Sequence, residues 1–262
     1  MESQNTNNQK KKKKFQLYER PWLSLLAVYA ITVLSILISV IIIFQLIGLS
    51  DSSSKGQFFQ SMTFHILVSF ILAPFILRLP KGKRTYRQYL DDIGFTRIQP
   101  FFRLLILAVS CYLILVLSQV AASFVFRFFE GGAINGIFIR QVFNLSKDLP
   151  PNSASLLISL PSMFEEVAFR GIVLTVFLNR YSERKAILFS SIGFGLIHLL
   201  NVTNDMELVW VLGQVVWSFS LGLFYGYIFT KTRSLLPPMI VLLPRQCVYQ
   251  FIDRLYSDQR IN

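Results

Sequence analysis

The chain has 262 residues, of which 53% are hydrophobic and only 15% are charged, whereas a soluble domain carries about 25% charged residues. The charges gather between long apolar runs, so the composition excludes an ordinary soluble globular protein. The net charge of +12 does not indicate nucleic-acid binding, because the basic residues flank apolar runs and are not interleaved with aromatic residues.

The N-terminal tail is polar and basic. Residues 1–14 are expected to be disordered, and Lys10 to Lys14 form a block of five lysines before the first apolar run. Basic residues beside membrane helices mark the cytoplasmic side and attract anionic lipid headgroups. The sequence therefore predicts a cytoplasmic N-terminus and binding of anionic lipid through these lysines.

Seven apolar runs follow, and a helix needs about 20 apolar residues to cross the hydrocarbon core. The runs lie near residues 22–48, 58–78, 101–127, 154–178, 186–200, 208–229 and 234–251. Loops rich in Lys and Arg (78–97, 180–185 and 231–233) alternate with loops poor in them (49–57 and 201–207). We therefore predict an all-α fold, a polytopic membrane helix bundle of about seven transmembrane helices.

The second run contains His65, one of only two histidines in the chain. A lone histidine in an apolar helix is usually a hydrogen-bonded core residue, and we interpret His65 in that way.

The fourth run carries charged residues that are expensive in a membrane, Glu165, Glu166 and Arg170. Glu166 and Arg170 are four residues apart, which places them on one helix face and allows an ion pair. Glu165 is rotated from Glu166 by about 100° and points elsewhere. One carboxylate is thus neutralised locally, and the other is left to act as a general base. A purely structural charge network between helices is the alternative.

The fifth run contains Phe194 and His198, four residues apart and therefore on one helix face. A glutamate and a histidine together can hold and activate a water molecule. The sixth run has small residues at Ser218, Gly222 and Gly226, a stripe that lets helix backbones approach closely in lipid. We assign this stripe to packing.

These motifs resemble those of the CPBP family of intramembrane proteases, which includes the CAAX prenyl endopeptidases and the Abi or bacteriocin-processing proteins. Glu165-Glu166-x-x-x-Arg170 is similar to the first family motif, and Phe194-x-x-x-His198 to the second. The resemblance implies catalytic roles for Glu165 and His198 and supporting roles for Glu166, Arg170 and Phe194. It covers the core at residues 150–252, between N-terminal transmembrane helices at 15–149 and a C-terminal tail at 253–262.

The third family motif is altered in this chain. The resemblance implies a histidine and, four residues later, an asparagine that stabilise the oxyanion, but Leu242 and Gln246 stand at these positions. Leu242 cannot donate a hydrogen bond, so Gln246 is the candidate oxyanion donor. Loss of one such donor typically lowers the rate by ~10²–10³-fold.

Two functions remain open. The first is an endopeptidase that cleaves a membrane-associated peptide or protein with a water activated by Glu165 and His198, without a cofactor. The second is a non-catalytic member that binds or regulates another membrane protein. The intact first two motifs favour the peptidase, and the altered third motif favours the scaffold. No metal is expected, because Glu165, Glu166 and His198 alone provide few ligands for a metal ion.

Overall fold

The computed structural model describes residues 19–51, 53–77, 85–129, 161, 163–204 and 208–242, and these residues contain helices and no strand. The predicted all-α fold is therefore confirmed for this part of the chain. In the first half, the helical elements are α1 (Pro21–Val40), η2 (Ile41–Leu46), α2 (Ser54–Ile66), η3 (Leu67–Leu72), α3 (Ala73–Ile76), α4 (Tyr86–Asp92) and α5 (Phe101–Phe129).

The second half begins with a helix over residues 163–178, which we call the motif helix because it carries Glu165, Glu166 and Arg170. It consists of helical residues 163–166, the π-helix η4 (Val167–Leu174) and α8 (Thr175–Leu178). The elements that follow are α9 (Glu183–Ile197), the 3-10 helix η5 (His198–Asn204), α10 (Leu208–Thr232) and α11 (Leu236–Leu242).

Four of the helices are long and apolar enough to cross a membrane: 21–46, 55–76, 183–202 and 211–232. Helix α5 is also apolar over residues 101–117, the first part of its 29 residues. Helical segments lie at all seven predicted runs. Among the described residues, however, only these four helices are candidate membrane spans, and the predicted number of about seven is not confirmed. Helix α4 is an additional short element in the loop at 78–97, where a capping box between Thr85 and Gln88 starts it.

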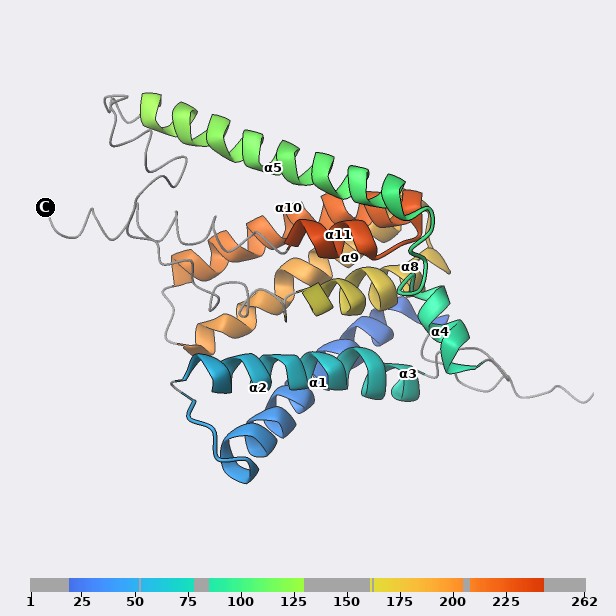
Figure 1. The fold of residues 1–262 in the computed structure, drawn as a ribbon, viewed down its shortest axis with the longest axis vertical. Helices are drawn as coiled ribbons and strands as arrows, with labels where there is room; N and C mark the ends of the chain where they lie inside the picture. The colour runs from blue at the N-terminus through green and yellow to red at the C-terminus, as the bar shows by residue number, and fades with distance from the viewer. Residues whose placement is uncertain are drawn as a thin grey trace, which may run out of the picture.

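The motif helix lies inside the bundle. Figure 1 shows it between α2 on one side and α10 and α11 on the other, with α5 along the outer side of α11. Its residues 167–174 are all buried. A first apolar cluster joins this helix to α1, η3, α4 and α9, and a second cluster joins α5, α10 and α11. This position buries the charged side chains of Glu166 and Arg170.

Helices α9 and α10 pack closely through their small residues. A methyl group at Gly222 would meet the Ser191 Cβ at 2.8 Å, and one at Gly195 would meet the Val215 carbonyl oxygen at 2.8 Å. Gly226 faces Ile187 in the same interface. The packing role predicted for the stripe Ser218, Gly222 and Gly226 agrees with these contacts.

Candidate active site

The ion pair at the centre of the site joins Glu166 to Arg170. The Arg170 Nε lies 3.0 Å from the Glu166 Oε2, and the two side chains are 0% and 1% exposed. The predicted i,i+4 pair is therefore present, on the first turn of the π-helix η4. Wide π-helical turns often occur at functional sites. A buried pair of this kind requires both partners, because either charge alone would be strongly destabilised.

Phe194 of α9 covers the guanidinium of Arg170. The Arg170 Cζ lies 4.1 Å from the centroid of the Phe194 ring and 5.5 Å from that of Tyr225 in α10. A cation over the face of an aromatic ring is attracted by the ring quadrupole, by about 2 kcal/mol or more when it is desolvated. The pairing of the two motifs thus has a direct physical meaning: the aromatic residue of the second motif stabilises the cation of the first.

Tyr225 was not found by the sequence reasoning. It is 1% exposed and belongs to the apolar cluster of α5, α10 and α11. Its only signal in the sequence is its place one residue before Gly226 in the small-residue stripe, which does not indicate contact with a cation. The contact follows from the close packing of α10 against the other core helices.

His198 lies level with the two glutamates. The motif helix and α9 are joined by the short turn at 179–182, so they run antiparallel. Arg170 contacts Phe194, so these two residues lie at the same height. Glu166 lies one turn before Arg170, and His198 lies one turn after Phe194. Because the helices run in opposite directions, Glu166 and His198 also lie at the same height. The His198 ring packs edge-on against Phe194 at 5.3 Å between centroids. His198 begins the 3-10 helix η5, where α9 ends.

Glu165 differs from Glu166 in its surroundings. It is only half-buried, and among the residues that the structure describes no cation forms an ion pair with it. The ring contact of Phe164 with Phe70, at 5.9 Å, places this part of the motif helix beside η3. The predicted division between one paired and one unpaired glutamate therefore agrees with the described contacts.

Of the two positions of the altered third motif, the structure describes only Leu242. Leu242 ends α11, is 0% exposed and belongs to the apolar cluster that also contains Tyr225. Gln246 lies outside the described residues, as do Lys10 to Lys14. In the part of the chain that the structure describes, no group of three or more His, Cys, Asp or Glu residues is arranged to hold a metal ion.

The comparison with protein families decides the assignment. Residues 150–242 match the family model described as type II CAAX prenyl endopeptidase, Rce1-like. This segment is therefore similar to the Rce1-like domains of the CPBP family, and we call it the Rce1-like domain. No curated protein and no solved structure gives a significant match to the chain. The Rce1-like domain contains the motif helix, α9, α10 and α11, so the ion pair, its aromatic partners and His198 all lie inside it. Together with the apolar helices, the match identifies the chain as a membrane protein.

Proposed function

We propose that the chain is an intramembrane endopeptidase that hydrolyses a membrane-associated peptide or protein with a water activated by Glu165 and His198. The observation that carries this proposal is the division between the two adjacent glutamates. Glu166 is fully buried in its ion pair with Arg170, whereas Glu165 is half-buried and lies one residue away. A carboxylate committed to a buried cation is a poor proton acceptor, so Glu165 is the general base.

The reaction needs no cofactor in this proposal. Glu165 accepts a proton from the water held between it and His198, and the water oxygen attacks the scissile carbonyl carbon to form a tetrahedral oxyanion. The C–N bond then breaks, and Glu165 returns the proton to the leaving amine. Arg170, Glu166 and Phe194 fix the helix that carries Glu165, and they do not contact the substrate.

The oxyanion requires a hydrogen-bond donor, which we assign to the amide of Gln246. Leu242 offers none, and its apolar surroundings in α11 give the reason that a leucine is accepted there. We expect the peptidase to be slow, because one missing oxyanion donor costs a factor of ~10²–10³ in rate.

A non-catalytic function is the second candidate. The burial of Leu242 in an apolar cluster favours it, since a position that packs against α5 and α10 serves stability rather than hydrolysis. In this case the Rce1-like domain binds or regulates another membrane protein, with Glu165 and His198 as binding groups.

We further propose the arrangement of the chain in the membrane. The bundle has about seven transmembrane helices with a cytoplasmic N-terminus, because the basic loops alternate with loops poor in Lys and Arg. The lysines at 10–14 contact anionic lipid headgroups beside the first span.

The decisive experiment reconstitutes the purified chain in liposomes with a panel of membrane-tethered peptides and analyses the products by mass spectrometry. We expect slow cleavage that is lost in Glu165→Gln. The matched control is Glu183→Gln, an exposed glutamate paired with Lys231 at 2.7 Å at the other end of α9, which retains cleavage. Cleavage that persists in Glu165→Gln would exclude this mechanism.

Restoring the third motif gives an independent test. Leu242→His combined with Gln246→Asn restores the histidine and the asparagine of the third family motif at their spacing of four residues. If oxyanion stabilisation is the limiting deficiency, turnover rises by ~10²-fold or more, and the gain disappears when Glu165→Gln is added. A folded double variant that cleaves no peptide of the panel would favour the non-catalytic function.

A further inference from the structure

The second histidine of the chain, His65 in α2, is buried and held in a fixed orientation. It is 6% exposed, its Nδ1 lies 2.8 Å from the Ser61 carbonyl oxygen, and its ring packs against Phe64 at 4.0 Å between centroids. A carbonyl oxygen only accepts hydrogen bonds, so the Nδ1–H must donate. The neutral ring then presents Nε2 as a hydrogen-bond acceptor, the usual way in which a backbone carbonyl fixes a functional imidazole.

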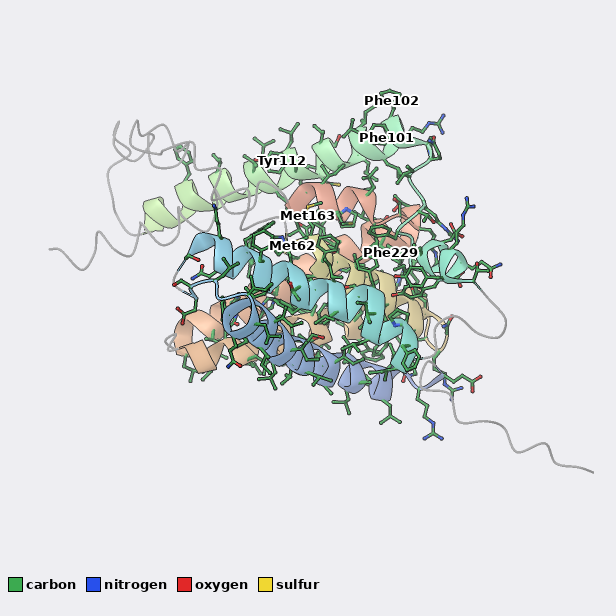
Figure 2. All side chains as sticks on the ribbon, turned by 60° about the horizontal axis from the view of Figure 1, so that its bottom comes forward. Met62, Phe101, Phe102, Tyr112, Met163 and Phe229 are labelled. Atoms are coloured by element: carbon green, nitrogen blue, oxygen red, sulfur yellow. The ribbon has the colours of Figure 1, made fainter. Side chains whose placement is uncertain are left out.

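His65 lies in the last turn of α2, directly before η3, whose Phe70 contacts the start of the motif helix. Phe70 contacts Phe164 ring to ring at 5.9 Å, and Met62 and Met163 lie near each other in the view of Figure 2. His65 lies between Met62 and Phe70 along its helix, and Glu165 directly follows Phe164.

The two polar residues also interact through charge. The negative charge of Glu165 acts on the buried His65 ring. Phe64, Phe70 and Phe164 all pack against the same core cluster, so the two polar residues lie beside apolar side chains. An imidazole and a carboxylate that interact inside an apolar bundle are costly to bury and mark a functional site more often than a packing contact.

We propose that Glu165 and His65 form one polar site, in which the His65 Nε2 accepts a hydrogen bond from the water that Glu165 activates. The proposal rests on the proposed peptidase function and deepens it. Glu165 takes one proton of the water, and His65 accepts a hydrogen bond from the second O–H without taking its proton. The site thus contains a second imidazole, contributed by α2, in a chain where Leu242 stands at the third-motif position.

Two substitutions separate this function from a packing role. His65→Gln places an amide near the position of Nε2 and keeps a polar group directed to the water. His65→Asn places its amide near the position of Nδ1 and keeps the hydrogen bond to Ser61, but it loses the group at Nε2. A residue that only stabilises α2 would be replaced better by asparagine, and a residue that orients water better by glutamine.

The site itself can be tested without any turnover. The chain contains only two histidines, so full-length protein in nanodiscs with ring-¹⁵N-histidine gives two sets of imidazole signals, which are assigned with His65→Gln and His198→Gln. We expect Glu165→Gln to shift the His65 signals and the control Glu183→Gln to leave them unchanged. His65 signals that stay unchanged in Glu165→Gln would overturn the proposal.

Turnover in liposomes then tests the orientation of the water. We expect His65→Asn to lower kcat by on the order of 10²-fold with little change in KM, as misplacement of a reacting group does, while His65→Gln keeps most of the activity and both variants keep the melting temperature. Equal activity in His65→Asn and the unmodified chain would refute the role of Nε2. If the unmodified chain cleaves nothing, the peptidase function fails, and the imidazole signals still decide whether Glu165 and His65 share a site.

Discussion

At the scale of single residues, the centre of the site is a stack of charge and aromatic rings. Arg170 has Glu166 on one side and the rings of Phe194 and Tyr225 over its guanidinium. All four side chains are buried. A planar guanidinium can bind a carboxylate and stack on rings at the same time, which a lysine ammonium cannot do. The first two motifs are therefore one physical unit, which holds the motif helix in place.

The ion pair predicts different consequences for the loss of Arg170 and for the loss of Glu165, the glutamate beside its partner Glu166. Arg170→Ala leaves the Glu166 carboxylate buried without its cation, and breaking a buried pair in this way costs about 3–5 kcal/mol. Glu165→Ala removes a half-buried carboxylate that has no ion-pair partner among the described residues, so its effect on stability is small. The thermal melting of detergent-solubilised protein measures both. Equal losses in the two variants would contradict this division of roles.

The aromatic contact with Arg170 leads to a second prediction. Phe194 and Phe169 are both buried, and their rings lie 5.0 Å apart. Replacing either by leucine removes a similar apolar area, but only Phe194 has the Arg170 cation 4.1 Å from its ring centroid. Phe194→Leu should therefore destabilise the protein by about 1–2 kcal/mol more than Phe169→Leu. Melting temperatures that fall equally would show that the ring acts only through its apolar surface.

At the scale of helices, the bundle depends on the close approach of α9 and α10. Gly195 and Gly222 remove side chains where the two backbones meet. In lipid there is no hydrophobic driving force between helices, so this approach supplies the van der Waals contact that holds them together. It also brings Tyr225 of α10 over Arg170.

Two glycines of α10 provide a matched test of this packing. Gly222→Ala puts a methyl group 2.8 Å from the Ser191 Cβ, whereas a methyl group at Gly213 meets nothing within 4 Å. We expect Gly222→Ala to lower stability by about 1–3 kcal/mol, the usual cost of overpacking. Gly213→Ala should be neutral or stabilising, because alanine is the better helix former by up to ~1 kcal/mol. Thermal melting distinguishes them, and a stable Gly222→Ala variant would show that the helices can separate without loss.

The sequence predicted contacts within helices better than contacts between them. The Glu166–Arg170 pair follows from their spacing of four residues, because helical geometry alone determines which residues share a face. Tyr225 contacts Arg170 across a helix interface, and nothing in its own segment marks it. The sequence singles out His65 only as one of two histidines. Helix α4 was missed for another reason: its seven residues, Tyr86–Asp92, are too short and too polar to resemble a span.

At the scale of the whole molecule, the segments with basic residues meet at one end of the bundle. Trp22 at the start of α1 donates a hydrogen bond to the Tyr181 hydroxyl at 3.1 Å, and Lys231 at the end of α10 pairs with Glu183 at 2.7 Å. The backbone N–H of Leu235 donates to the Gly94 carbonyl at 3.1 Å. The beginning of α1, the turn at 179–182 and the loops after α4 and α10 therefore lie together, as Figure 1 shows near α4 and α8.

This clustering is independent of the rule that predicted these segments to be cytoplasmic. That rule counts Lys and Arg along the sequence, whereas the hydrogen bonds and the ion pair place the same segments side by side in space. A topology that placed any of these segments on the opposite side of the membrane would conflict with these contacts. The orientation of the common end remains a prediction from charge.

Cysteine accessibility decides that orientation. In a background with Cys111→Ser and Cys247→Ser, we place single cysteines at two exposed positions: Ser50, between α1 and α2, and Asn179, in the turn before α9. The charge rule predicts that the basic end faces the cytoplasm. Asn179→Cys should then react with a membrane-impermeant maleimide only from the cytoplasmic side, and Ser50→Cys only from the opposite side. Reaction of both cysteines from the same side would refute the predicted positions of these two loops on opposite sides of the membrane. If Ser50→Cys reacted only from the cytoplasmic side and Asn179→Cys only from the other, the whole bundle would be inverted, and the lysines at 10–14 would lie away from cytoplasmic anionic lipid.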